Sequence, residues 1–244
     1  MVNSRVTASR IAPSLGVMNP DVPSLLYGLS VWTVPVLLAI TLHEAAHAYV
    51  AWHCGDDTGR LLGRISLDPR RHIDPVGTIL LPGILILMGA PFLFGYAQPV
   101  PVNQGRLRRP RRDMMLVAAA GPAANVAQAI VALVLLKLVN EIDGSGGWLA
   151  ANLSRMVVFN VALAVFNLLP IPPLDGAHIA IGLLPPDLSR SMKELMPHGM
   201  VILIGLVVVL PSIGHRLGID LDMVGGLARA ISEPVLDGLV WVFG

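Results

Sequence analysis

Apolar residues are gathered along this chain in long blocks, and polar residues collect in the stretches between them. The blocks occupy residues 23–53, 76–96, 114–139, 151–169 and a stretch from about 200 to 210 or beyond. A helix needs about 20 apolar residues to cross a bilayer, and most of these blocks reach that length. The pattern therefore predicts an all-α polytopic membrane protein with about four to five transmembrane helices.

The block at 76–96 differs from the others because several prolines and glycines interrupt it. Such a segment suits a bent or re-entrant path as well as a full crossing. Residues 61–67 could add a small membrane-associated β element, as one short strand. We expect a flexible tail at 1–22, a membrane-embedded core at 23–218, and an amphipathic or membrane-surface tail at 219–244.

The composition agrees with a membrane-embedded chain. Of its 244 residues, 54% are hydrophobic and 14% are charged, and the mean hydropathy is +0.69. Soluble domains carry roughly 25% charged residues. The net charge of +1, with no basic stripe and interleaved aromatic residues, excludes a nucleic-acid-binding protein. The single cysteine, Cys54, excludes a disulfide within the chain.

The first apolar block contains the motif His43-Glu44-Ala45-Ala46-His47. Residues four apart share one face of a helix, so both imidazoles can point at one metal ion. Glu44 follows the first histidine, where a zincin helix carries its general base. Ionisable side chains inside a bilayer are costly and usually mark a functional site. The motif therefore suggests a metalloprotease site built inside a membrane.

Two histidines do not complete such a site, because a catalytic zinc ion normally takes three protein ligands and a water. The candidates for the third ligand are His53, His72, Asp74, Asp175 and His178. Asp175 is the strongest, since it follows an apolar helix and a rigid proline-rich turn. His53 lies nearly opposite the motif on its helix. His72 and Asp74 lie in a polar loop, where solvated or turn-capping roles are more common.

The need for Asp175 to meet the histidines constrains the topology. The C-terminal ends of the 23–53 and 151–169 helices must then lie at the same membrane face. Four simple crossings would place them at opposite faces. A segment 76–96 that enters and returns on one side brings them together, so we predict that it is re-entrant.

The distribution of positive charge supports this arrangement. With 76–96 re-entrant, the loops 55–75, 97–113 and 171–198 share one side and hold 11 of the 17 Lys and Arg residues. The opposite loop, 140–152, holds none. Because positive residues accumulate on the cytoplasmic side, these loops and the site are predicted to face the cytoplasm.

Three motifs together resemble the site-2 protease family of intramembrane zinc metalloproteases. They are H-E-A-A-H, the G-P-x-x-N of residues 121–125, and N-L-L-P-I-P-P-L-D-G at 167–176. The stretches G-R-I-S-L-D-P-R-R-H-I-D-P-V-G-T and G-Y-A-Q-P-V-P-V-N look like a compact prokaryotic subgroup that lacks PDZ and CBS domains. The resemblance covers roughly residues 25–210. Gln98 departs from it, since a lysine is expected there.

The resemblance implies a bound Zn²⁺, with His43, His47 and Asp175 as ligands, zinc-bound water as nucleophile and Glu44 as general base. Its substrates would be transmembrane segments of other membrane proteins, cleaved at the cell membrane, where this chain would be a multi-pass protein. Asn125 could contact the substrate or the oxyanion, or only join two helices. The oligomeric state and the natural substrate stay open.

His178, three residues after Asp175, could support a ligand without itself binding the metal. Two other functions remain as alternatives. A membrane metal-ion transporter would also carry His and Glu on its helices, although it needs ligands through the membrane thickness, and the later apolar blocks have almost none. A catalytically inactive relative would bind metal without cleaving.

Overall fold

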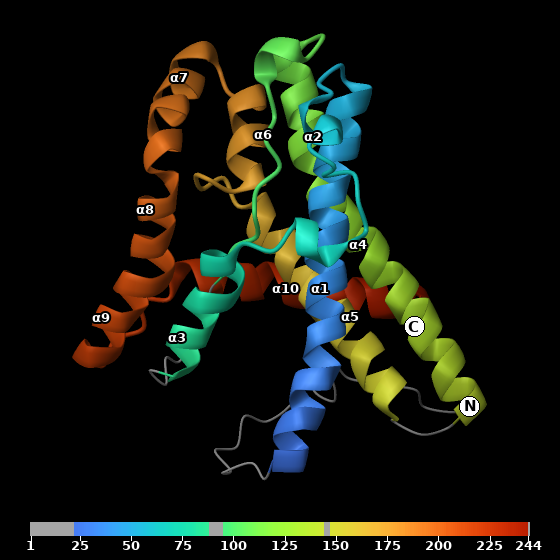
Figure 1. Cartoon of the computed structure of the whole chain (residues 1–244). Coiled ribbons are helices and arrows are strands. Elements are labelled where there is room, and N and C mark those ends of the chain that lie inside the picture. Colours follow the sequence, from blue (N-terminus) through green and yellow to red (C-terminus); the bar gives the residue numbers. More distant parts are fainter. Residues whose placement is uncertain (1–21, 88–94, 144–146, 244) are drawn as a thin grey trace.

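The structure is a computed structural model that describes residues 22–87, 95–143 and 147–243, and every regular element in these ranges is helical (Figure 1). The expected tail at 1–22 thus lies outside the described residues, apart from Val22. The strand expected at 61–67 is wrong. Leu61 ends the short helix α2 (Thr58–Leu61), and Gly63 turns the chain with a φ of +69°. No strand lies beside this segment in the described part of the chain.

Three long helices form the centre of the molecule: α1 (Val22–His53), α4 (Pro110–Asp143) and α5 (Trp148–Leu168). Figure 1 shows α4 running in the opposite direction to α1 and α5. Small residues are fully buried on these helices, among them Ala39, Ala118 and Ala129. Lipid tails remove most of the hydrophobic drive between helices, so close backbone approach at small residues holds them together. Each helix is long and apolar enough to cross a membrane, which confirms the predicted fold class.

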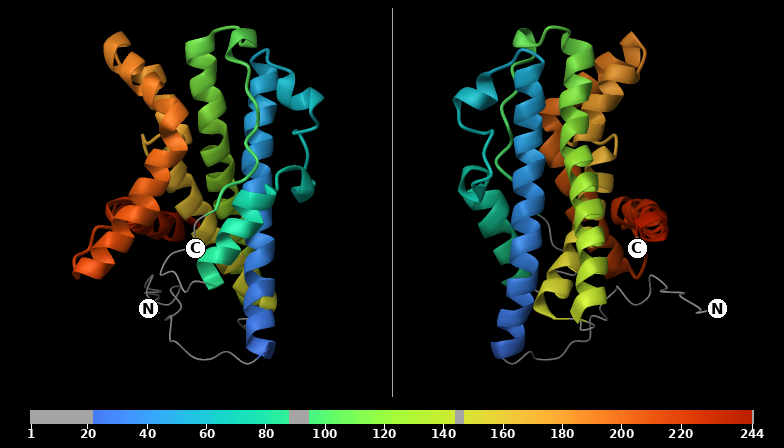
Figure 2. Two further views of the ribbon diagram at one scale, coloured as in Figure 1. Left: turned by 60° about the vertical axis from the view of Figure 1, so that its left-hand side comes forward. Right: turned by 90° about the vertical axis from the view of Figure 1, so that its right-hand side faces the viewer.

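A fourth candidate span, residues 186–217, leans away from this bundle and is mostly exposed (Figure 2). Its successive helical pieces are α7 (Pro186–Leu195), η5 (Met196–His198), α8 (Gly199–Ile204), η6 (Gly205–Val209) and α9 (Leu210–Leu217). The prediction of a loop at 171–198 is therefore wrong over most of these residues. Its polar residues, such as Arg190 and Lys193, lie on the exposed side of an amphipathic helix.

The segment predicted to be re-entrant, residues 76–96, begins and ends at neighbouring positions in the structure. It descends through η3 (Pro75–Leu80) and α3 (Leu81–Leu87), too short together to cross a bilayer. The N–H of Tyr96 then donates to the Gly77 carbonyl at 3.0 Å, and the Thr78 hydroxyl donates to the Tyr96 carbonyl at 2.8 Å. A side chain at Gly77 would collide with the Tyr96 ring. The start and end of the segment thus lie side by side, as a re-entrant path requires.

The turn after α5 brings the next helix, α6 (Asp175–Leu183), against the bundle. The Pro172–Pro173 peptide is cis, and the Leu174 N–H donates to the Ile171 carbonyl at 2.9 Å. A Cβ on Gly176 would collide with the backbone carbonyls of Leu168 and Leu169. Glycine at this position therefore lets α6 start close to the end of α5, with Asp175 as its first residue.

The other end of α6 is tied to α4. The Arg111 guanidinium donates to the carbonyls of Gly182, at 3.0 Å, and Leu184, at 2.5 Å. A Cβ on Gly182 would collide with the Met115 side chain. Both ends of α6 are consequently held against the helices that flank the site.

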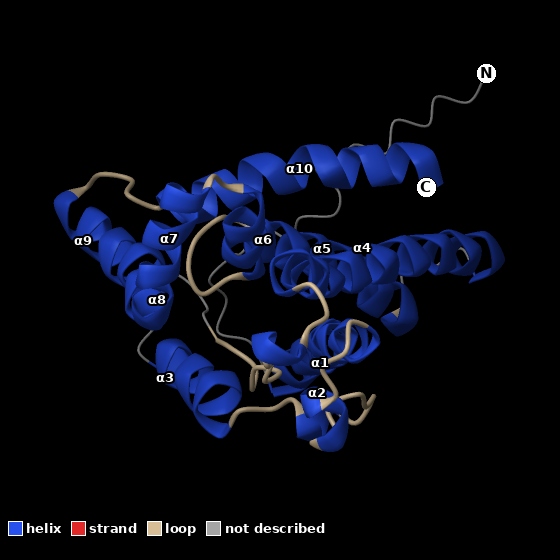
Figure 3. Ribbon diagram, turned by 90° about the horizontal axis from the view of Figure 1, so that it is seen from above, coloured by secondary structure: helices blue, strands red, loops and turns tan. Residues whose placement is uncertain are grey.

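The C-terminal helix α10 (Met223–Phe243) runs crosswise over α5 and α4 (Figures 1 and 3). Leu236 and Leu239 pack against Val157 and Val161 of α5. Asp222 begins the helix by accepting from the Gly225 N–H at 2.9 Å. The tail predicted at 219–244 is thus largely one helix, packed on the side of α5 and α4 away from α1.

A buried carboxylate fastens the end of α1 to the chain that approaches α4. Asp56 is fully buried and accepts from the Thr58 hydroxyl at 2.5 Å, the Thr58 N–H at 3.1 Å and the Asn103 N–H at 2.6 Å. Burial alone would raise the pKa of this carboxyl. The hydrogen bonds and the nearby Arg106 outweigh burial and hold the pKa below its ordinary value.

Replacing Asp56 with asparagine should lower the free energy of unfolding by about 1–3 kcal/mol at pH 7, because an amide leaves buried N–H groups badly paired. The lowered pKa means that the stabilisation exists above about pH 4 and is lost as the pH falls through the folded-state pKa. Thermal unfolding in detergent should therefore show a gap between wild type and variant that narrows in acid. Asp57→Asn, which alters a more exposed carboxylate paired with Arg106, is the control. Equal losses in both variants would contradict this role for Asp56.

Candidate metal centre

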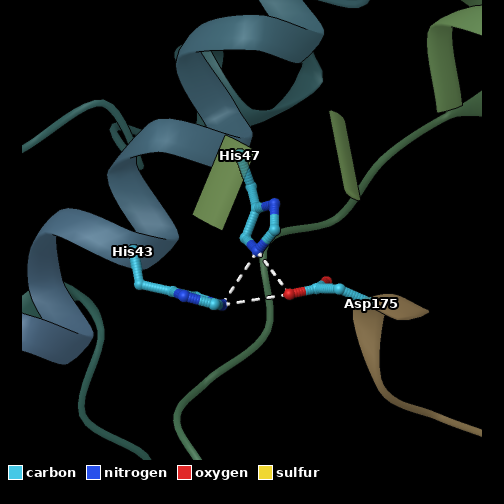
Figure 4. Close-up of side chains that lie close together, drawn as sticks. All are labelled: His43, His47 and Asp175. Carbon is cyan, nitrogen blue, oxygen red and sulfur yellow. Dashed lines mark hydrogen bonds and ion pairs between the residues drawn. The ribbon is translucent and has the colours of Figure 1, made fainter. Parts of the chain in front are cut away.

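Three side chains predicted as metal ligands, two from α1 and one from α6, point toward one another (Figure 4). His43 Nε2 and His47 Nε2 lie 3.0 Å apart, and each lies 3.3 Å from Asp175 Oδ2. Both histidines are buried, with exposed fractions of 5% for His43 and 8% for His47. Among the described residues, this is the group of three His, Cys, Asp or Glu side chains close enough to hold one metal ion. The structure thus brings together the first turn of α6 and the motif on α1, more than a hundred residues earlier.

The hydrogen bonds at the far side of each imidazole decide which nitrogen carries the proton. His47 Nδ1 lies 2.7 Å from the Val117 carbonyl, which can only accept, so Nδ1 is the protonated nitrogen. His43 Nδ1 lies 2.6 Å from Asn125 Oδ1, and the Asn125 amide nitrogen already donates elsewhere. His43 Nδ1 is therefore protonated too. The tautomers follow from the hydrogen-bond network.

Three lone pairs consequently converge on one point. In neutral imidazoles with protonated Nδ1, both Nε2 atoms are acceptors, and they face each other and a carboxylate oxygen. Asp175 Oδ2 is buried without a hydrogen-bond donor. Three acceptors at these separations repel one another unless a cation lies between them. The arrangement is that of a cation site.

The spacing of these atoms fits a zinc ion. With bonds of about 2.0–2.1 Å, a tetrahedral zinc ion places neighbouring ligand atoms about 3.3 Å apart. The observed separations are 3.0, 3.3 and 3.3 Å. Two imidazole nitrogens and one carboxylate oxygen also form a donor set used by catalytic zinc sites, which leave one position for water.

Gly121 of α4 allows this close packing. A Cβ on Gly121 would collide with the Nε2 atom of His47, and it would lie 2.6 Å from the Nε2 atom of His43. The glycine of the G-P-x-x-N motif thus lets α4 pass directly beside both imidazoles. Pro122 follows it within the helix.

Glu44 is half-buried on the same helix and faces the chain that returns from the re-entrant segment. Its Oε2 atom accepts from the Val100 N–H at 3.3 Å. Gln98, which precedes Val100 by two residues, is exposed and donates its N–H to the His72 carbonyl at 2.9 Å. The extended residues 97–103 therefore run beside the carboxylate predicted to act as general base.

The remaining candidates lie apart from the three ligand atoms. His53 contacts the Tyr49 carbonyl, His72 the Ser66 carbonyl, and Asp74 caps η3 through the N–H groups of Val76 and Gly77. His178 lies half-buried on α6, and no hydrogen bond within the described residues joins it to the ligands. Burial lowers its pKa, although Asp175 opposes that shift.

The structure adds one residue that the sequence did not single out. Asn160 of α5 is fully buried and accepts from the Asn125 amide at 2.7 Å. Nothing in its local sequence distinguishes it, since α5 also carries Asn152 and Asn167. Its side-chain partners become visible only in the packed bundle.

Comparison with known proteins identifies the family. The model of peptidase family M50 matches residues 145–210. A Bacillus subtilis protein named "Putative zinc metalloprotease YwhC" is 35% identical over 213 residues, which cover 83% of this chain and 93% of the relative. This chain belongs to peptidase family M50.

A second relative, "Putative zinc metalloprotease Rip2" of Mycobacterium tuberculosis, is 33% identical over 170 residues, covering 70% of this chain and 63% of that protein. The Mycolicibacterium smegmatis protein of the same name is 28% identical over 172 residues, covering 70% and 64%. No solved structure matches the chain significantly. The family and the four apolar helices make this M50 member a membrane-embedded metalloprotease.

Gly121→Ala should weaken metal binding by about tenfold or more, because the added methyl group displaces both imidazoles from their common point. Zinc affinity, measured by competition with a chromophoric chelator on the detergent-purified protein, tests this. Gly28→Ala is the matched control, since a Cβ at Gly28 meets nothing within 4 Å. A Gly121→Ala protein that binds zinc as tightly as wild type would refute the packing argument.

Proposed function

We propose that this M50 member is an intramembrane zinc metalloprotease that hydrolyses peptide bonds within or near transmembrane segments of other membrane proteins. His43, His47 and Asp175 are the zinc ligands and Glu44 is the general base. The observation that carries this proposal is the convergence of three lone pairs beside α1, a helix long enough to cross the membrane. The names of the relatives YwhC and Rip2, which both include zinc metalloprotease, support it.

Exposed aromatic residues suggest the depth of the site. Tyr49 and Trp52 lie exposed near the C-terminal end of α1, and Tyr27 and Trp32 lie exposed near its start. Aromatic side chains collect at the two membrane interfaces, so these pairs suit the two edges of a bilayer. His47 precedes Trp52 by five residues, or about 7–8 Å along a helix. The ligands then lie inside the membrane but close enough to one surface for water to reach them.

The residues around the site have distinct tasks in hydrolysis. A bound zinc ion supplies a water of lowered pKa and a Lewis acid for the scissile carbonyl. Glu44 takes the proton from the attacking water and delivers it to the leaving nitrogen. The Val100 N–H holds the carboxylate on the side of α1 that faces residues 97–103. In this proposal Asn125, which is fully buried, holds the zinc ligand His43 through a hydrogen bond. Its polar atoms are all engaged with protein groups.

The extended residues 97–103 offer a place for an unwound substrate. The N–H groups of Gln98, Val100 and Asn103 already donate to His72, Glu44 and Asp56. Pro99 and Pro101 have no N–H to give. We infer that this segment receives a substrate strand mainly through its carbonyl groups, beside the general base.

We also infer that the site faces the cytoplasm of the cell membrane. Nine arginines between residues 55 and 113 lie at the end of the molecule that carries the site. The turn between α4 and α5, at the other end, carries no positive residue from 140 to 152. The positive-inside rule favours this orientation.

Glu44→Gln should reduce cleavage of a membrane-protein substrate by about 10²–10⁴-fold while zinc content stays near wild type, because the amide cannot accept the proton of water. Cleavage is followed in proteoliposomes, and zinc is measured by mass spectrometry. A metal-ion transporter would instead move zinc equally well in both proteins, with cleavage in neither. Wild-type protein that binds zinc but cleaves no membrane substrate would favour the inactive relative.

The single cysteine allows a direct test of orientation. Cys54 follows the last residue of α1 at the end near the site, and it is half-buried. A membrane-impermeant maleimide should label it in inverted vesicles and leave it unlabelled in intact spheroplasts. Burial raises the pKa of the Cys54 thiol, so labelling should quicken as the pH rises.

A cysteine substituted for Glu141, which is exposed near the C-terminal end of α4, provides the reverse control in a Cys54→Ser background. It should be labelled in spheroplasts and not in inverted vesicles. Labelling of Cys54 from outside intact spheroplasts would overturn the cytoplasmic orientation.

A further inference from the structure

Two fully buried amides lie between the three central helices, next to the metal centre. Asn125 belongs to α4 and Asn160 to α5, and neither exposes any surface. Uncharged amides at this depth are costly unless each donor and acceptor is paired. Asn125 pairs with α1, at both His43 and the Ala39 carbonyl, and with Asn160 of α5. The pair therefore connects a proposed zinc ligand to the far side of the bundle.

Two backbone carbonyls that can only accept, those of Met156 and Ala39, fix the direction of these hydrogen bonds. The Met156 carbonyl can only accept, so the Asn160 amide nitrogen donates to it, at 2.9 Å. Asn160 Oδ1 then points to Asn125 and accepts from its Nδ2 at 2.7 Å. Asn125 Oδ1 is left to face His43 Nδ1, at 2.6 Å. Asn160 Oδ1 and the Ala39 carbonyl, which both accept from the Asn125 amide nitrogen, thus determine together which way Asn125 is turned.

The orientation of Asn125 has a chemical consequence for His43. An Oδ1 atom facing the ring requires a proton on Nδ1 and leaves the Nε2 lone pair for the metal. A flipped Asn125 would present its NH₂ group to the ring and favour the tautomer with the proton on Nε2, which cannot bind a cation. A partner on the far nitrogen of a metal-binding histidine generally fixes both the tautomer and the ring position.

We propose that Asn160 is a positioning residue for the metal centre, acting on His43 through Asn125. This inference rests on the proposed function, because it presumes that His43 binds zinc. Asn160 touches neither metal nor substrate. Its contribution, shared with the Ala39 carbonyl, is to keep Asn125 turned so that the His43 Nε2 lone pair points at Asp175 and His47.

Helix α5 provides a matched control. Asn152 is also buried on α5, and its amide donates to the Trp148 carbonyl four residues earlier, at 2.9 Å, as Asn160 does to Met156. Asn152 Oδ1 has no hydrogen-bond partner. The two asparagines therefore share the local bond within the helix and differ in the bond to Asn125.

The experiment compares Asn160→Leu, Asn160→Asp and Asn152→Leu in the full-length protein purified in detergent. Zinc affinity is measured by chelator competition, and ¹⁵N NMR of labelled histidine in the metal-free protein reports the His43 tautomer. Asn160→Leu should weaken zinc binding by about 10–100-fold and reduce the Nδ1-protonated form. Asn160→Asp should bind zinc within a few-fold of wild type, because a buried, protonated carboxyl can replace both amide bonds. Asn152→Leu should match wild type in both measurements.

Two results would overturn the proposal: an Asn160→Leu protein with wild-type affinity and tautomer, or an equal loss of zinc affinity in Asn152→Leu. Asn160→Ala serves as a second removal variant if leucine prevents folding. Wild-type protein that binds no zinc would instead refute the proposed metal site itself. Absence of proteolysis with normal zinc binding would refute the proposed activity and leave the role of Asn160 intact.

Discussion

The structure is built around three lone pairs that point at one place. His43, His47 and Asp175 bring two imidazole nitrogens and a carboxylate oxygen within 3.0–3.3 Å of one another. Acceptors in a poorly solvated interior repel at such distances, so surrounding groups must hold them in place until a cation binds. The hydrogen bonds at Nδ1 of each histidine do this from α4, through Asn125 and the Val117 carbonyl.

The packing around the site follows from that requirement. Helix α4 must lie against both imidazoles, and the absence of a side chain at Gly121 permits it. Helix α6 must begin close to the end of α5, and Gly176 permits that approach. Arg111 then holds the far end of α6 to α4. The geometry of the site therefore depends on glycine at these two positions as well as on the ligands, because bulkier residues would separate the helices that carry the ligands.

The bilayer adds a second requirement, which the re-entrant segment meets. Both α1 and α5 must end at the same face for Asp175 to reach His43, and the contact between Gly77 and Tyr96 returns the chain to that face. The returning residues then pass Glu44 and are fastened at Asp56. One segment therefore sets the topology and also supplies the extended chain beside the predicted general base.

The sequence by itself determined the features that depend on residue spacing along a helix and on the transfer of apolar side chains from water into lipid. Apolar blocks defined the three central helices, and the four-residue spacing put His43 and His47 on one face. The place of Asp175 after an apolar helix and a proline-rich turn singled it out as third ligand, and this requirement together with the charge distribution predicted the re-entrant segment. Such inferences are possible because helical period and hydrophobicity act over short stretches of chain.

Only the tertiary structure decided what depends on contacts between helices. Asn160 has the same local hydrogen bond as Asn152, and its partner Asn125 lies on another helix. The polar residues of 171–198 resembled a loop, whereas the structure places most of them on two helices, α6 and α7. The proton positions on both histidines likewise follow from groups on α4. Side-chain partners far apart in sequence are fixed by packing, which no local pattern encodes.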